Sequence, residues 1–191
     1  MAKILVFIYD GMADFETSLL THLLGADCGK ELLVVSNDVG IVKSKSGMLF
    51  VPHIELKKVI TDEVDGIIIP GGWLANLDEK LIDIIRELHD ENKLIAAICA
   101  APWILAKAGV LYNRKYTTSI VEWQDKHLEF FGIDDPFPRE CYVEGRVIRD
   151  GNIITAKGMA FIDFTIEVCD YFGLFKDETE KKEFENDIKG Y

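Results

Sequence analysis

The stretch LIAAICAAPWIL, residues 94–105, decides how this chain folds. Its first five residues form a continuous apolar run, which predicts a short strand buried on both faces of a sheet. Pro102 fits the first turn of a helix, where its missing N–H costs nothing, and Gly109 is expected to end that helix. Cys99 then lies on a sharp strand-to-helix turn between small residues. This is the layout of a nucleophile elbow, without the literal GxSxG motif.

The alternation of strand and helix continues on the N-terminal side of this stretch. Buried strands are predicted at Ile4–Tyr9, Leu32–Ser36 and Asp65–Ile69, with helices at about 14–26 and 76–91. This order predicts an α/β fold in which a mostly parallel central sheet has helices on both faces. The ligand crevice of such a sheet lies beyond the carboxyl ends of its strands.

The remaining elements are predicted from turn residues and apolar periodicity. Asp14 is expected to cap the first helix. No linker or internal repeat divides the chain. Residues 1–175 are therefore expected to form a single domain, and residues 176–191 a charged C-terminal helix or tail. The other expected elements are a small hairpin at Gly40–Pro52, a strand at Tyr116–Ser119, a helix at Ile120–Phe131, a hairpin of Tyr142–Arg149 with Asn152–Thr155, and a helix at Met159–Phe172.

Composition argues against several classes of protein. The 191 residues carry a formal net charge of −12, which repels phosphate backbones and anionic membranes. We therefore expect no nucleic acid and no membrane as partners. No apolar run is long enough to span a bilayer or to form the core of a signal peptide, so a cytoplasmic location is expected.

The four cysteines are scattered along the chain. They form no CxxC pair and no cluster with histidine, which argues against structural zinc and against a disulfide framework. Cys28, Cys141 and Cys169 are expected to be core residues. The metal-site motif HExxH and the dinucleotide motif GxGxxG are missing, so neither a metal nor a cofactor is expected.

Cys99 is the residue most suited to carry chemistry. The N-terminus of the helix after it has free N–H groups and a positive dipole end, which predict a lowered pKa for the Cys99 thiol. Gly71 and Gly72 follow a buried strand, and glycine lets backbone N–H groups approach a ligand closely. The N–H groups of Gly72 and Ala100 are therefore candidates for an oxyanion hole.

Glu16 follows the first strand and can reach the same crevice. A protonated Glu16 that donates to the Cys99 sulfur would favour the thiolate and would itself have a raised pKa. The alternative is a surface glutamate in the first turn of a helix, where the dipole favours a negative charge. Among the histidines, His127 lies on a predicted helix after a crevice loop, but the chain offers no evident Cys–His pair. Trp103, like Trp73 and Trp123, either lines a pocket or packs in the core.

Four segments, in this order, resemble the ThiJ/PfpI superfamily. This superfamily is a branch of the class I glutamine amidotransferase-like fold and includes the parkinsonism-associated protein. The resemblance covers about residues 3–173 and implies a flavodoxin-like three-layer sandwich, usually a homodimer. It also implies that Cys99 is the nucleophile, Glu16 its acid partner, and Gly72 and Ala100 the oxyanion donors. The four segments are DFE at 14–16, IPGG at 69–72, AAICAAP at 96–102 and TAKG at 155–158.

The chain departs from this family at two positions. Ala100 stands where protease-like members have histidine, and Ser119 follows the Thr117-Thr118 pair where other members have histidine. Ser119, Gly71 and Trp103 are candidates to line the site. The resemblance implies a cysteine-dependent protein acting on a small electrophilic carbonyl, as a glyoxalase or deglycase does. One alternative is a non-catalytic oxidative-stress sensor or chaperone that acts through Cys99 oxidation. A second is an amidase, peptidase or glutamine amidotransferase-like hydrolase.

Overall fold

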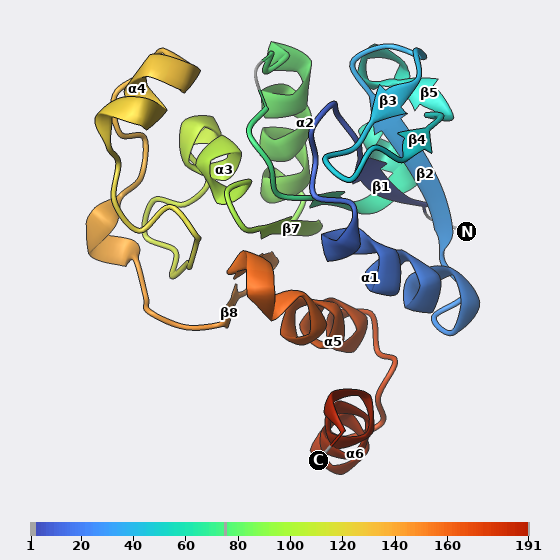
Figure 1. Ribbon diagram of the computed structural model, residues 1–191. Coiled ribbons are helices and arrows are strands. Elements are labelled where there is room, and N and C mark those ends of the chain that lie inside the picture. Colours follow the sequence, from blue (N-terminus) through green and yellow to red (C-terminus); the bar gives the residue numbers. More distant parts are fainter. Residues whose placement is uncertain (1–2, 75, 191) are drawn as a thin grey trace.

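A seven-stranded sheet lies at the centre of the computed structural model, which describes residues 3–74 and 76–190 (Figure 1). Its strands are β1 (Lys3–Phe7), β2 (Glu31–Ser36), β5 (Ile54–Glu55), β6 (Val64–Ile69), β7 (Leu94–Ile98), β8 (Val147–Asp150) and β9 (Ile153–Ala156). The strand order is β5-β2-β1-β6-β7-β9-β8, and neighbouring strands are parallel except for the pair β8 and β9. The prediction of a mostly parallel α/β sheet is confirmed.

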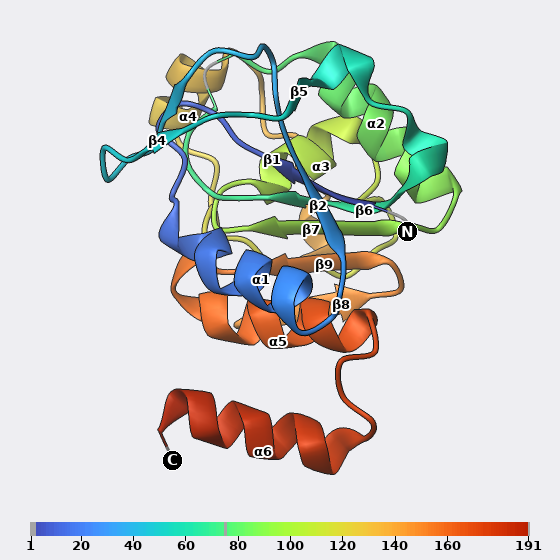
Figure 2. The ribbon, with the colours of Figure 1, turned by 90° about the vertical axis from the view of Figure 1, so that its right-hand side faces the viewer.

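Helices cover both faces of this sheet and give three layers. They are α1 (Phe15–Ala26), α2 (Glu79–Asp90), α3 (Pro102–Ala108), α4 (Asp125–Phe131), α5 (Phe161–Tyr171) and α6 (Glu178–Lys189). Helices α1 and α5 pack together on one face, and α2 and α3 pack together on the other (Figure 2). Helix α6 lies beyond α5 and contacts it (Figure 2).

The central strands are apolar on both faces because both faces are covered. Every residue of β7 is buried, as the continuous run of apolar residues predicts. Helix α2 buries an apolar stripe that includes Leu81, Ile85 and Leu88, and each such side chain contributes about 1.5–3 kcal/mol. The Asp78 side chain caps α2 by accepting from the Lys80 N–H at 2.9 Å.

The parallel arrangement brings several loops to one edge of the sheet. Strands β1, β6, β7 and β9 run in the same direction, so the segments that follow them emerge together. These segments lead into α1, carry Pro70-Gly71-Gly72, carry Cys99, and lead into α5 through a 3₁₀ turn at Gly158–Ala160. The fold therefore collects four of the segments that were singled out in the sequence.

The strand predicted at Tyr116–Ser119 is wrong. Tyr116 makes only an isolated bridge with Tyr142. The Thr117 N–H donates to the Thr155 hydroxyl (2.9 Å), and the Ser119 N–H donates to the Cys99 carbonyl (2.8 Å). The segment thus crosses the ends of β7 and β9, and its backbone groups are satisfied there instead of in a strand ladder.

The helix predicted at Ile120–Phe131 is shorter than expected, since α4 has seven residues, Asp125–Phe131. It begins at Asp125, because the Arg139 guanidinium binds the carbonyls of Ile120 and Val121 at 3.0 and 2.9 Å. These carbonyls are therefore held outside a helix by a side chain distant in the sequence.

Asp14 is the N-cap residue of α1, but its side chain does not cap the helix. It accepts a hydrogen bond from the Ser46 hydroxyl at 3.0 Å instead. Ser46 belongs to the hairpin of β3 (Val42–Lys43) and β4 (Leu49–Phe50), which lies in the predicted region Gly40–Pro52.

The first strand of the second predicted hairpin and the helix predicted at Met159–Phe172 are both shorter than expected. Strand β8 begins only at Val147, and α5 begins at Phe161 after the 3₁₀ turn. The charged segment after residue 176 forms α6, which Lys189 ties to Asp163 at 2.7 Å. Among the described residues, no helix is long and apolar enough to cross a membrane.

Candidate functional site

Cys99 occupies the turn between β7 and α3 in a left-handed backbone conformation, with φ of 64°. This conformation costs a residue with a side chain about 1–2 kcal/mol. Three hydrogen bonds hold it. The Cys99 N–H donates to the Ala156 carbonyl (2.8 Å), and the Cys99 carbonyl accepts from the Ser119 N–H (2.8 Å) and the Thr118 hydroxyl (2.9 Å). The strained turn is therefore fixed on both sides, and it presents Cys99 to a pocket.

Glu16 lies in the first turn of α1, yet only 2% of it is exposed. Its Oε2 accepts a hydrogen bond from the Gly71 N–H at 2.7 Å, and its carboxyl group is hydrogen-bonded to the Cys99 thiol. The structure thus places Glu16 against Cys99, not on the surface. A buried carboxyl group beside a thiol is a pair that can exchange a proton.

Two glycines leave the room that this pair needs. A methyl group added at Gly71 would lie 2.5 Å from Glu16 Oε2 and 3.1 Å from Cys99 Sγ. One added at Gly158 would lie 2.8 Å from Glu16 Oε1 and 2.9 Å from the same sulfur. These distances are shorter than side-chain contacts allow. Glycine at both positions is therefore a condition for the Glu16–Cys99 pair.

Burial governs the protonation of this pair. Burial raises the pKa of Glu16 to about 7, although the hydrogen bonds from Gly71 and Cys99 and the charge of Lys45 lower it. Burial, together with the Glu16 carboxylate, raises the pKa of Cys99 to about 11, although hydrogen bonds from Ser119 and the Ala100 N–H lower it. The two groups titrate as a pair, so that between about pH 7 and 11 they hold one proton.

The lowered thiol pKa that the sequence predicts for Cys99 is therefore wrong. Helix α3 has only seven residues and begins three positions after Cys99, so its dipole is weak at the sulfur. Desolvation and the carboxylate outweigh it. Cys99 needs a base to remove its proton, and Glu16 is in contact with it.

A pocket of about 400 Å³ opens above the pair. Its walls are largely apolar and include Trp73 and the exposed Met159, and Lys45 adds a cation. The lining residues are Ala13, Phe15, Glu16, Lys45, Gly72, Trp73, Cys99, Ala100, Ser119, Gly158 and Met159. The volume suits a small molecule.

Trp103 is not among the residues that line this pocket. It is 3% exposed, and its ring packs on Phe131 with centroids 4.5 Å apart. It points into the layer between α3 and α4, because it lies on the buried face of the short helix α3. Trp73, on the loop after β6, lines the pocket instead.

The backbone donors at the pocket have different environments. Gly72 has a left-handed φ of 128°, and a methyl group there would lie 2.9 Å from both the Gly11 carbonyl oxygen and the Tyr9 hydroxyl. Ala100 donates its N–H to the Cys99 sulfur. Both residues line the pocket.

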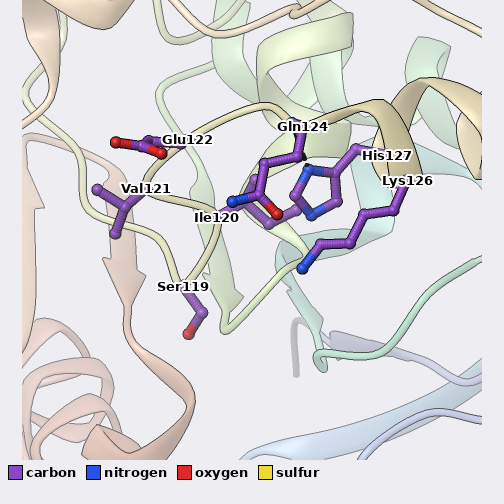
Figure 3. Close-up of a pocket in the computed structure, with 7 residues that line it drawn as sticks. All are labelled: Ser119, Ile120, Val121, Glu122, Gln124, Lys126 and His127. Carbon is purple, nitrogen blue, oxygen red and sulfur yellow. Dashed lines mark hydrogen bonds between the residues drawn. The ribbon is translucent and has the colours of Figure 1, made fainter.

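Ser119 joins this pocket to a second one of about 380 Å³ (Figure 3). Its hydroxyl accepts a hydrogen bond from the Gly158 N–H at 3.1 Å and is hydrogen-bonded to the Cys99 sulfur. His127 lines the second pocket, but its Nδ1 accepts from the Gln124 N–H at 2.9 Å and thereby caps α4. His127 thus has a structural partner away from Cys99.

Sequence reasoning missed four residues that line the pocket. Lys45 comes from the β3–β4 hairpin, Ala13 and Met159 lie next to two named motifs, and Phe15 lies inside one of them. Met159 and Phe15 could have been found because they adjoin TAKG and lie inside DFE. Lys45 had no such marker. Among the described residues, no group of three or more His, Cys, Asp or Glu side chains could hold a metal ion.

Comparison with known proteins gives consistent matches over most of the chain. Residues 2–170 match the model of the DJ-1/PfpI family. The deglycase PfpI of Pyrococcus furiosus is 32% identical over 155 residues, which span 73% of this chain and 93% of that protein. Protein DJ-1alpha of Drosophila melanogaster is 29% identical over 175 residues, or 87% of this chain and 75% of that protein.

Solved structures agree with this assignment. The DJ-1 superfamily protein Atu0886 from Agrobacterium tumefaciens has a TM-score of 0.80 and 25% identity, with both chains covered in full. DJ-1beta of Drosophila melanogaster has a TM-score of 0.76 and 26% identity, over 100% of this chain and 97% of that one. With the motifs and the fold already described, these matches show that the chain belongs to the DJ-1/PfpI family.

Proposed function

We propose that this protein is a cofactor-independent cysteine enzyme that converts small 2-oxoaldehydes or their adducts, in the manner of a glyoxalase or deglycase. The observation that carries the proposal is the buried, hydrogen-bonded pair of Glu16 and Cys99 at the base of a small pocket. Relatives named deglycases, such as those of Pyrococcus furiosus and Thermococcus kodakarensis, support the same substrate class.

The first step joins sulfur to carbon. Glu16 accepts the thiol proton as the Cys99 sulfur attacks the aldehyde carbon, and the C=O electron pair moves onto oxygen. We expect the N–H groups of Gly72 and Ala100, two residues that line the pocket, to stabilise this oxyanion. Glu16 then returns the proton to the oxygen, which gives a hemithioacetal on Cys99.

The second step moves a hydrogen within the bound substrate. Glu16 removes the proton from the former aldehyde carbon, and the ketone oxygen takes up a proton, which gives an enediol. Glu16 then returns its proton to the former ketone carbon while the hydroxyl group on the sulfur-bearing carbon loses its proton and becomes the carbonyl, so the hemithioacetal becomes a thioester of a 2-hydroxy acid. Water then breaks the thioester, releasing the acid and restoring the Cys99 thiol. The chain needs no external oxidant or reductant, because one carbon is oxidised while its neighbour is reduced.

The pKa of Glu16, raised to about 7 by burial, suits this role near neutral pH. Near neutral pH a carboxyl group with that pKa is partly protonated and partly ionised, so it can both accept and donate a proton. Because Glu16 must begin as a carboxylate, kcat/KM is expected to rise as the pH increases through about 7.

The two alternatives have weaker support. A sensor that acts only through oxidation of Cys99 gives no role to the largely apolar pocket of about 400 Å³ that this residue lines. A peptidase or amidase needs a base that also protonates an amine leaving group. The residues beside the Cys99 sulfur include Ala100 and Ser119, neither of which is a base near neutral pH, and His127 caps α4.

The test is turnover of methylglyoxal by the wild type, Cys99→Ala and Glu16→Gln. We expect Cys99→Ala to lose all measurable turnover and Glu16→Gln to lose about 10²–10⁴-fold in kcat/KM. Cys141→Ala, which removes a half-buried cysteine elsewhere in the chain, is the matched control and should retain full activity.

Alkylation of Cys99 in the Glu16→Gln variant separates the enzyme from the sensor. Removing the carboxylate lowers the pKa of Cys99, so alkylation should begin at a lower pH than in the wild type. Faster alkylation together with lost turnover supports Glu16 as the catalytic base. Unchanged turnover in Glu16→Gln, or turnover that survives in Cys99→Ala, would refute the proposed function.

The proposal places the enzyme in the cytoplasm as a homodimer. Four free thiols suit a reducing compartment.

Exposed apolar side chains on and beside the β3–β4 hairpin, among them Ile41, Leu49 and Val51, suit contact with a second copy. Light scattering coupled to gel filtration should give twice the mass of 21.6 kDa, and a mass of one chain would contradict the dimer.

A further inference from the structure

Two cysteines that are far apart in the sequence meet on the face of the sheet covered by α1 and α5. Cys28 follows the end of α1, and Cys169 lies in the last turns of α5. These helices pack side by side, and the two thiols are hydrogen-bonded to each other. The scattered spacing of the cysteines concealed this contact, because the fold alone brings the two elements together.

The backbone around both thiols is fixed. The Cys28 N–H donates to the Leu23 carbonyl at 3.0 Å, which closes the end of α1. The Cys169 carbonyl accepts from the Leu174 N–H at 3.0 Å, which closes the end of α5. The thiols therefore meet as parts of two ordered helix ends, and not through a chance approach of loops.

The two thiols differ in access. Cys28 is half-buried, whereas Cys169 is 0% exposed. Burial raises the pKa of Cys28, and the nearby Asp27 carboxylate adds to this, while the Lys30 ammonium acts in the opposite direction. Because Cys28 is partly exposed and Cys169 is enclosed, Cys28 is the member of the pair that a small oxidant reaches first.

We propose that Cys28 and Cys169 form a dithiol site that hydroperoxides oxidise to an intramolecular disulfide. The Cys28 sulfur attacks a peroxide oxygen, the O–O bond breaks, and water or an alcohol leaves. Cys28 is thereby oxidised to the sulfenic acid and the peroxide is reduced. The Cys169 sulfur then attacks the Cys28 sulfur, the S–O bond breaks, and the hydroxyl group leaves as water with the Cys169 proton. The two thiols together lose two protons and two electrons.

This site is separate from the one at Cys99. Helix α1 has 12 residues, so its ends lie about 18 Å apart. Glu16 is in its first turn and Cys28 lies beyond its last. The proposal is therefore independent of the proposed function, and either can fail without the other.

The test uses the full chain with Cys99→Ala and Cys141→Ala, in which only the two proposed thiols remain. The protein is treated with hydrogen peroxide, unfolded, alkylated and weighed by mass spectrometry. We expect a mass lower by about 2 Da, no alkylation, and a cross-linked peptide pair containing both cysteines. Dithiothreitol should restore two alkylation sites. The oxidised form should also unfold at a higher temperature, by roughly 5 °C or more, because the cross-link constrains the unfolded chain.

Cys28→Ser in the same background is the control, and its partly exposed position lets the variant fold. It should show neither the cross-link nor the rise in unfolding temperature. Three results would overturn the proposal. They are two alkylated thiols after peroxide treatment, accumulation of Cys28 as a sulfinic acid beside a free Cys169, and a disulfide that joins two chains.

Discussion

Cys99 and Cys169 are two shielded thiols in one molecule, and they are prepared for different chemistry. Burial raises the pKa of both. Cys99 lies against a carboxyl group and faces a pocket, in a backbone conformation that costs energy. Cys169 lies in a regular helix, is fully enclosed, and has another thiol as its partner.

The difference shows that shielding from solvent does not by itself decide what a cysteine does. Desolvation makes both thiols harder to ionise. Only Cys99 has a neighbour that can take its proton and a cavity that can hold an electrophile. Cys169 has only a second sulfur with which to react. The neighbouring group and the access of a reactant therefore determine what each cysteine does. Three predictions test this difference between Cys99 and Cys169.

The largest expected effect is on the pH dependence of the free energy of unfolding, through the protonation of Glu16. Its pKa lies at about 7 in the folded protein, against an ordinary value of 4.5. Between these values the unfolded chain releases the proton while the folded protein keeps it, so the wild type loses about 3 kcal/mol of stability as the pH rises. Glu16→Gln keeps a neutral acceptor for the Gly71 N–H. It should equal the wild type near pH 4 and exceed it by about 3 kcal/mol above pH 7, in urea unfolding at each pH.

Glu129→Gln, an exposed change on α4, is the control and should show no such trend. If the stability difference of Glu16→Gln stayed constant from pH 4 to pH 8, Glu16 would not be the desolvated partner that distinguishes Cys99 from Cys169.

The next effect is steric. Gly158→Ala places a methyl group 2.9 Å from Cys99 Sγ and 2.8 Å from Glu16 Oε1, so one of the two must move. We expect kcat/KM for methylglyoxal to fall by about 100-fold, since a shift of about 1 Å at a reacting group has that effect. In Gly25→Ala the new methyl group meets only Leu32 Cδ1, at 3.8 Å, and this variant should keep full activity. Wild-type kinetics in Gly158→Ala would mean that contact between Glu16 and Cys99 is not required.

The smallest effect concerns the backbone, and it should have opposite signs at the two cysteines. Cys99 has a positive φ, so Cys99→Gly should be more stable than Cys99→Ala by about 1 kcal/mol. Cys169 lies inside α5, so there Cys169→Ala should be more stable than Cys169→Gly by about the same amount. Thermal unfolding of the four variants measures both differences. The same sign at both positions would show that the turn at Cys99 is not strained.

Much of the fold could be predicted from local patterns. The apolar runs that form β1, β6 and β7 are buried on both faces, and such runs have few other structures available. The segment from Tyr116 to Gln124 could not be predicted in this way. Its conformation depends on hydrogen bonds to Thr155 and to the guanidinium of Arg139, which are contributed by parts of the chain that come later.

For the site too, local patterns predicted which residues take part, but not the properties that depend on distant contacts. Cys99 and Glu16 could be chosen from the sequence because each follows a strand that ends at the same edge of the sheet. The direction of the Cys99 pKa shift could not be chosen, because it depends on how completely the pair is buried. Trp103 was misplaced for a related reason, since seven residues of α3 show too little periodicity to separate its inner face from its outer one.

Gly71 and Gly158 have a consequence for recognising chains of this kind. They come from different loops and approach the same two atoms from two directions. In this chain the two glycines leave open the volume that the carboxyl group and the thiol occupy together. We therefore expect a sequence of this fold with a larger residue at either position to hold its acid and its cysteine farther apart, and these two positions are the first to inspect when the proton exchange is sought in another chain.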